Sequence, residues 1–186
     1  MTWKTKAAFC AALTFALSPA FALAQGSAPP TPKSGDMAVT GNLGFATAID
    51  NDYEGVDPIL TGSFEYYTSS RISWRGMLGF SSFDHEAGNG NEVDISFVDA
   101  NIVFNWLQQG LRPFVTGGVG LYNEDASGPL GRVVDDGIEI GVNGGGGLDI
   151  FFQDQWAIKV EGLLHVVSGD GPDGFFSGTV GVKFHF

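Results

Sequence analysis

Apolar and polar residues alternate with a period of two along eight separate stretches of this chain. Alternation of this kind is typical of a β-strand whose two faces meet different surroundings. The stretches span residues 37–48, 59–67, 71–81, 93–106, 111–122, 138–151, 156–167 and 176–186. In the fourth stretch the alternation changes phase between Phe97 and Ala100, which predicts a β-bulge near Val98 and Asp99. The pattern as a whole predicts an all-β fold.

The connections between these stretches alternate strictly in length. Short turns lie at 68–71, 107–110 and 152–155, and longer polar loops lie at 49–58, 84–92, 123–136 and 168–174. This order predicts an up-and-down meander with every long loop at one end, the long-loop end, and both termini at the other, the short-turn end. Closing the sheet into an eight-stranded antiparallel barrel removes the two exposed edges of an open sheet. We therefore expect a closed β-barrel over residues 37–186.

Aromatic residues on the apolar face gather near both ends of the strands. Near the short-turn end they are Tyr66, Trp74, Trp106, Trp156, Phe184 and Phe186, and near the long-loop end they are Phe45, Phe80, Phe97 and Phe176. Aromatic girdles around an aliphatic waist are typical of transmembrane barrels, whereas a soluble core has no reason to sort rings to both ends. The pattern predicts that the apolar face contacts lipid and that the barrel is transmembrane.

The opposite face of the strands carries charged residues. They are Glu65, Arg75, Asp99, Glu139, Asp149, Lys159, Glu161 and Lys183. A Lys or Arg side chain facing lipid at mid-bilayer would cost about 2–4 kcal/mol, so we expect these residues to line the lumen as a self-neutralising polar network. Their spacing predicts that Glu65 neighbours Arg75 and that Asp149 neighbours Lys159. Since an eight-stranded barrel is filled by its own side chains, we expect no diffusion pore, and a narrow channel remains an alternative.

The first 24 residues have the organisation of a secretory signal peptide. Two lysines precede an apolar stretch at 7–17, and small residues end at Ala24. The apolar stretch is short for a membrane-spanning helix, which needs about 20 residues. We expect cleavage after Ala24, a flexible periplasmic leader at 25–36 and the barrel from residue 37 onward. The only cysteine, Cys10, lies in the signal peptide, so no disulfide is expected in the mature chain.

Two segments carry a resemblance to a known family. The segment 113–122 (PFVTGGVGLY) is similar to a Pro-aromatic-x-x-x-Gly-x-Gly strand of small outer-membrane barrels, and the segment 180–186 (VGVKFHF) alternates and ends in Phe. With these segments the chain resembles the eight-stranded outer-membrane barrels of the OmpA/OmpX type. The resemblance implies a Gram-negative outer membrane, long loops outside the cell, and contacts with outer-membrane lipid and lipopolysaccharide. It also implies a C-terminal signal, including Phe184 and Phe186, that the outer-membrane insertion machinery reads during assembly. We expect a monomer.

The mature chain is strongly acidic, and most of the acid lies in the long loops. Without the signal peptide it has seven Lys and Arg against 21 Asp and Glu, a net charge of −14. Nucleic acid is excluded as a partner, because phosphate binding needs clustered Lys and Arg. We expect solvated loops that are available to an extracellular partner, and a sharper hypothesis is that divalent cations bridge their carboxylates to lipopolysaccharide. No cofactor and no dedicated metal site are expected.

One segment offers the residue types of a hydrolase. Ser81, Ser82, Asp84, His85 and Glu86 place hydroxyl, imidazole and carboxylate groups at the outer end of the third stretch. Residues this close along an extended strand cannot all converge into a triad without help from the loop. We therefore expect no catalytic residue and no enzyme, but a structural, envelope-integrity or surface-interaction role through the acidic extracellular loops. A lipid A-modifying outer-membrane enzyme remains the alternative.

Overall fold

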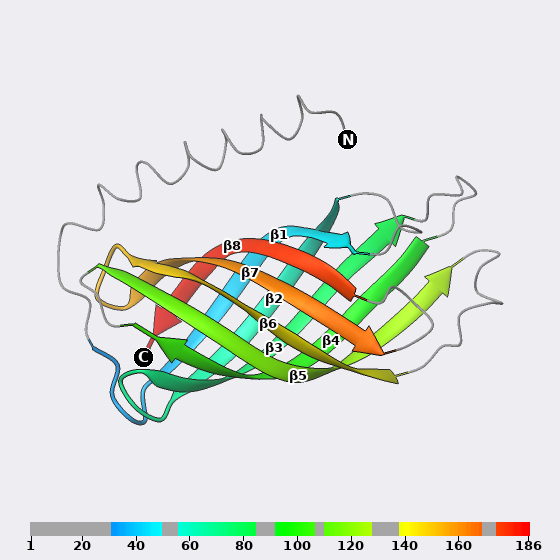
Figure 1. Cartoon of the computed structure of the whole chain (residues 1–186). Helices are drawn as coiled ribbons and strands as arrows, with labels where there is room; N and C mark the ends of the chain where they lie inside the picture. Colours follow the sequence, from blue (N-terminus) through cyan, green and yellow to red (C-terminus); the bar gives the residue numbers. More distant parts are fainter. Residues whose placement is uncertain (1–30, 50–55, 85–91, 107–109, 128–137, 169–173) are drawn as a thin grey trace.

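In the computed structural model, eight strands form one closed antiparallel barrel (Figure 1). The structure describes residues 31–49, 56–84, 92–106, 110–127, 138–168 and 174–186. The strands are β1 (Met37–Ala48), β2 (Asp57–Tyr67), β3 (Ile72–Asp84), β4 (Glu92–Asn105), β5 (Leu111–Ser127), β6 (Ile138–Phe151), β7 (Trp156–Ser168) and β8 (Gly174–His185). Each strand pairs with its neighbours in the sequence, and β1 closes the sheet against β8. The predicted eight-stranded up-and-down barrel is confirmed.

β1 begins and β8 ends at the short-turn end of the barrel (Figure 1). Met37 and Phe186 exchange two backbone hydrogen bonds there, of 3.0 and 2.9 Å. The predicted signal peptide, residues 25–30 of the leader and the middle parts of the long loops lie outside the described residues. Within the described ranges, no helix is long and apolar enough to cross a bilayer.

Six strands continue into residues that the alternation assigned to loops, and β3, β4 and β5 are examples. β3 runs to Asp84, β4 begins at Glu92 and β5 runs to Ser127. Backbone pairing continues in this region, where Asp84 lies opposite Glu92 and Asp94 lies opposite Asp125. The alternation missed the extension because outward positions change from apolar to polar near this end, which makes the sequence resemble a loop although the ladder of hydrogen bonds goes on.

The predicted β-bulge in β4 is wrong. Val98 lies opposite Leu78 and Asp99 opposite Met77, with no break in the register between β3 and β4. β4 therefore keeps one phase throughout, and Phe97 points into the barrel together with Asp99. The apparent phase change arises because polar side chains fill the lumen toward the short-turn end and apolar side chains fill it toward the long-loop end.

Glycines on the inner wall make room for large side chains of neighbouring strands. A Cβ atom on Gly79 would lie 2.0 Å from Cζ of Phe97, and one on Gly147 would lie 2.7 Å from Cζ of Phe114. Both separations are far below van der Waals contact, so each ring needs a glycine beside it. Close packing of this kind is one cause of the high glycine content, 28 of 186 residues.

The outward face of the barrel is apolar around its waist. Leu43, Leu78, Val119 and Val180 lie on β1, β3, β5 and β8, and the side chain of each is more than half exposed. Contiguous exposed apolar surface on this scale is typical of a protein embedded in a bilayer rather than of a soluble monomer.

Candidate functional site

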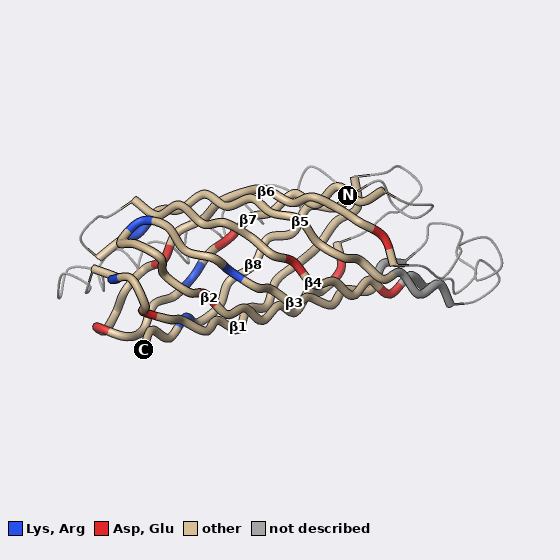
Figure 2. The backbone as a smooth tube through the Cα atoms, turned by 90° about the horizontal axis from the view of Figure 1, so that it is seen from below, with Lys and Arg blue, Asp and Glu red and all other residues tan. Residues whose placement is uncertain are grey.

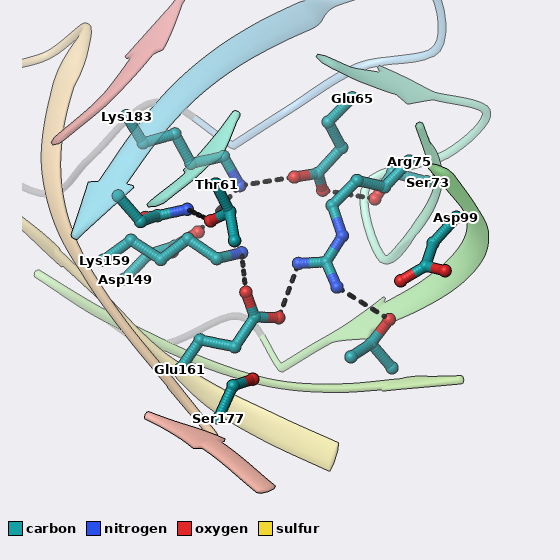
Figure 3. Close-up of polar contacts among 12 residues, drawn as sticks. Thr61, Glu65, Ser73, Arg75, Asp99, Asp149, Lys159, Glu161, Ser177 and Lys183 are labelled. Atoms are coloured by element: carbon teal, nitrogen blue, oxygen red, sulfur yellow. Dashed lines mark hydrogen bonds and ion pairs between the residues drawn. The ribbon is translucent and has the colours of Figure 1, made fainter. Parts of the chain in front are cut away.

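The charged part of the lumen is built around Lys183 on β8 (Figure 3). Its Nζ atom lies 2.7 Å from Oε2 of Glu65 and 2.9 Å from Oδ2 of Asp149. Ser73, on the neighbouring strand β3, donates a hydrogen bond to the Glu65 carboxylate. All four side chains are buried. Because one ammonium group contacts two carboxylates, this cluster joins β2, β6 and β8 across the lumen.

A second group of ion pairs centres on Glu161 of β7 (Figure 3). Nη1 of Arg75 lies 2.6 Å from one oxygen of the Glu161 carboxylate, and Nζ of Lys159 lies 3.8 Å from the other. Nη2 of Arg75 donates a hydrogen bond to Oγ1 of Thr116 at 3.3 Å. The Lys159 ammonium also lies 4.0 Å from the centre of the Phe114 ring, a cation–π contact. Charged side chains held by several partners therefore occupy the middle of the barrel.

The buried charges balance one another. Among the described residues the buried acids are Glu65, Asp99, Asp149 and Glu161, and the buried Lys and Arg residues are Arg75, Arg112, Lys159 and Lys183. Burying an ion costs several kcal/mol unless an opposite charge compensates it. Equal numbers of acids and bases therefore let the chain keep eight charges inside. Figure 2 shows that the described Lys and Arg residues lie toward the short-turn end, whereas Asp and Glu extend to the long-loop end.

Seven of the eight residues predicted for the lumen are buried in it, and Glu139, near the long-loop end, is half-buried. Arg75 lies opposite Glu65 in the register, as the spacing predicts, yet its ion pair is with Glu161. The second predicted pair, Asp149 and Lys159, is also in register, while Asp149 makes its ion pair with the β8 lysine. Long side chains in a narrow lumen reach the opposite wall, so strand register alone does not decide which charges meet.

Sequence reasoning missed Arg112 on β5. Its side chain is buried, and its guanidinium carbon lies 4.5 Å from the centre of the Phe151 ring on β6. The alternation held the signal, because Arg112 stands three positions before Val115 of the outward face and must therefore point inward.

An apolar plug fills the lumen toward the long-loop end. Its members are Ala46, Ile59, Met77, Ile95, Phe97, Tyr122, Leu163, Val167 and Phe175, none of them more than 5% exposed. They come from every strand except β6, so their side chains meet across the whole width of the barrel. The lumen is thus divided along its length into a charged part and an apolar part.

His165 on β7 lies at the boundary between the two parts. Its ring stacks on Phe175, with centroids 4.2 Å apart and an interplanar angle of 8°. The Tyr122 hydroxyl lies 2.9 Å from Nδ1, the Ser177 hydroxyl 3.3 Å from Nε2, and the Asp99 carboxylate 3.9 Å from Nδ1. These are the residue types of a catalytic triad, but Tyr122 and Asp99 approach the same nitrogen and every member is buried. The two hydroxyl groups therefore contact the two ring nitrogens of His165, while the Asp99 carboxylate is too far from Nδ1 for a hydrogen bond.

The two serines of the hydrolase pattern noted in the sequence lie on opposite faces of β3. Ser81 points inward and donates a hydrogen bond to a backbone carbonyl of β2, whereas Ser82 points outward and donates to Asp94 on β4. His85 and Glu86 lie outside the described residues, and of Asp84 only the backbone, at the end of β3, is described. Successive strand residues alternate between faces, which separates the two hydroxyls.

Nine of the ten residues predicted for the aromatic girdles lie on the outward face. Trp74 near the short-turn end and Phe80 near the long-loop end are each more than half exposed. The exception is Phe97, which is 3% exposed and belongs to the plug, so its assignment to the girdle is wrong. The plug contains large rings at the same height along the barrel as the aromatic girdle near the long-loop end. Position along the strand therefore cannot distinguish a ring in the lumen from a ring that faces lipid.

A sequence profile of the outer membrane protein β-barrel domain matches residues 7–186. The chain belongs to this family. Membership assigns the barrel to the Gram-negative outer membrane, and the apolar outward face is accordingly the one that meets lipid.

Solved structures with the same fold include Neisserial surface protein A, at 11% identity and a TM-score of 0.65, covering 82% of this chain and 99% of that one. OprG from Pseudomonas aeruginosa matches at 11% identity with a TM-score of 0.63, covering 83% and 97%. The outer membrane enzyme PagL matches at 12% identity with a TM-score of 0.51, covering 79% and 98%. At these identities the similarity shows the fold alone. No curated protein sequence matches the chain.

Proposed function

We propose that this barrel is a non-catalytic outer-membrane protein that holds its acidic loops at the cell surface, in an envelope-integrity or surface-interaction role. The observation that carries the proposal is that side chains occupy the lumen along its length. Balanced ion pairs fill it toward the short-turn end, His165 and its polar neighbours come next, and the apolar plug follows toward the long-loop end. A conducting pore would require both the plug and the ion pairs to move aside.

Burial of the polar groups also supports a role without catalysis. The hydroxyl, imidazole and carboxylate groups of Ser177, His165 and Asp99 are all buried, and the imidazole is stacked on Phe175 of the plug. A lipid substrate would have to displace Phe175, which is stacked directly on the imidazole. Loops on such a rigid scaffold are the part free to recognise a partner.

The termini fit an exported protein that is inserted from the periplasm. We propose that the signal peptide is cleaved after Ala24 and that the insertion machinery reads the C-terminal segment through Phe184 and Phe186. The Phe184 ring packs against Trp156, with centroids 4.6 Å apart, and stacks on Phe186 at 6.0 Å. These rings form part of the aromatic girdle near the short-turn end, where the protein would contact lipid. The assembled protein is proposed to act as a monomer.

Planar-bilayer conductance of the refolded chain tests the proposal. We expect no steady conductance under conditions in which a large porin, added as a positive control, conducts. A large steady conductance would refute the plugged lumen and favour a channel. Mass spectrometry of lipid A from cells with and without the protein tests the enzyme alternative. An altered acyl pattern that is lost in either the His85→Ala or the His165→Ala variant would overturn the non-catalytic assignment.

A further inference from the structure

The outward wall of the barrel carries a groove of about 540 Å³ near the long-loop end, the outer-wall groove. One row of the register crosses it from β1 to β5 and changes from apolar to polar on the way. Its members, in order, are Leu43, Leu60, Phe80, Ser96 and Asn123. Ser82 and Asp94 lie opposite each other in the next row toward the long-loop end. The short serine side chains beside the Phe80 ring leave the wall hollow at this place.

The outer-wall groove has an apolar part and an anionic part. Leu60 and Phe80 are each more than half exposed and continue the lipid-facing surface. The Asp94 side chain is exposed, and its carboxylate accepts a hydrogen bond from the Ser82 hydroxyl. The row of Asp94 lies two residues beyond the row of Phe80, which is about 7 Å along a strand. One small molecule is therefore long enough to contact both parts.

No positive charge in the described part of the chain balances Asp94. It forms no ion pair with a described Lys, Arg or His residue, and none of these types lines the groove there. The described outer ends of β3, β4 and β5, at 80–84, 92–96 and 123–127, also contain none. Their charged residues are Asp84, Glu92, Asp94, Glu124 and Asp125. The electrostatic potential at the groove is therefore negative, so it attracts cations and repels phosphate and carboxylate groups.

These features select a small ligand that is both apolar and cationic. The volume of the groove falls in the range of small-molecule sites, roughly 300–1,000 Å³. An ammonium group has three donors and no acceptor, whereas the Asp94 carboxylate, the Ser96 hydroxyl and the Asn123 amide oxygen all accept hydrogen bonds. A bare calcium ion takes six to eight oxygens, more than this set supplies, and would leave the apolar part unused.

We infer that the outer-wall groove binds a small hydrophobic amine in its ammonium form. The ammonium group lies between Asp94 and Ser96, and the apolar body lies along Leu60 and Phe80. Phe80 belongs to the aromatic girdle near the long-loop end, and such girdles lie at the level of the lipid headgroups. An amphiphilic amine that enters the membrane surface therefore reaches the groove from the side, without passing through the lumen or contacting the loops.

Photo-crosslinking of the full mature barrel in phosphatidylcholine nanodiscs tests the inference. The probe is dodecylamine with a diazirine on its chain, and mass spectrometry locates the labelled residues. We expect saturable labelling around Leu60 and Phe80. Asp94→Asn removes the charge but keeps the shape, and it should weaken binding about five- to tenfold, between the effect of an exposed ion pair and that of a hydrogen bond to a charged group. Asp154→Asn, the same change at an exposed position in the turn before β7, is the matched control and should bind like the wild type.

Uncharged and anionic probes separate recognition of the ammonium group from simple partitioning into the membrane. Dodecanol and dodecanoate that carry the same diazirine should label the groove at least fivefold more weakly than the amine. Ser96→Leu, which fills the groove, should abolish saturable labelling by the amine. Heat-modifiable gel mobility confirms that each variant is folded before it is compared.

Four outcomes would overturn the inference. These are equal labelling by the amine, the alcohol and the acid; equal affinities of Asp94→Asn and Asp154→Asn; labelling away from β2 to β4; and labelling of the groove by a helical peptide of Leu and Lys but not by the amine, which would assign the groove to a peptide. The proposed function is tested separately, because steady conductance would contradict it without changing the binding of an amine to the outer wall.

Discussion

Removing the ammonium of Lys183 should destabilise the barrel more than any exposed charge substitution. In Lys183→Met the carboxylates of Glu65 and Asp149, now 2.7 and 2.9 Å from the ammonium, lose their shared partner while remaining buried. Breaking a buried ion pair by removing one partner costs about 3–5 kcal/mol. Two carboxylates are affected here, but the buried ammonium group of Lys159 also attracts both of them, so we expect a loss within that range rather than twice as large.

Equilibrium urea unfolding in lipid vesicles, followed by tryptophan fluorescence, measures this loss. Arg71→Met, at an exposed position in the turn before β3, is the control and should change the free energy of unfolding by less than about 1 kcal/mol. The triple variant Glu65→Gln, Asp149→Asn, Lys183→Met removes both orphaned charges and should recover most of the loss, leaving about 1–3 kcal/mol for missing hydrogen bonds. If Lys183→Met unfolds like Arg71→Met, or if the triple variant is less stable than Lys183→Met, the reasoning about buried charge is wrong.

Three further results are expected. Gly79→Leu should lower the folded yield, because the new side chain would collide with Phe97. The control Gly76→Leu, on the same strand, should fold normally, because a Cβ there meets no atom within 4 Å. Equal folded yields of the two variants, measured by gel mobility, would contradict the packing argument. Leu78→Arg, at the lipid-facing waist, should cost about 2–4 kcal/mol in vesicle unfolding, and a cost near zero would place Leu78 away from the hydrocarbon region. Chelation of divalent cations should reduce co-purification of lipopolysaccharide with the protein if the loop carboxylates are bridged by such ions; unchanged co-purification would exclude the bridges.

The sequence by itself was enough to define the strands and their order. A barrel with lipid outside and charge inside imposes unlike faces on every strand, so the period of two appears wherever those faces differ. Residues such as Arg75, Lys159 and Lys183 are buried where the alternation placed them. Arg112 could have been predicted to line the lumen as well, because it occupies an inward position in the alternation of β5. Turn lengths supplied the rest of the topology.

The tertiary structure alone decided how the lumen is filled. Phe97 was predicted to face lipid because it is apolar, yet it lies in the plug. At that level of the barrel the inward and outward side chains are both apolar, so the alternation cannot tell the two faces apart. Arg75 meets Glu161 rather than its register neighbour Glu65, because closing the barrel brings β3 and β7 within reach of two long side chains. The alternation along a strand depends only on the different surroundings of its two faces. Which side chains meet across the lumen depends instead on the curvature and closure of the whole sheet.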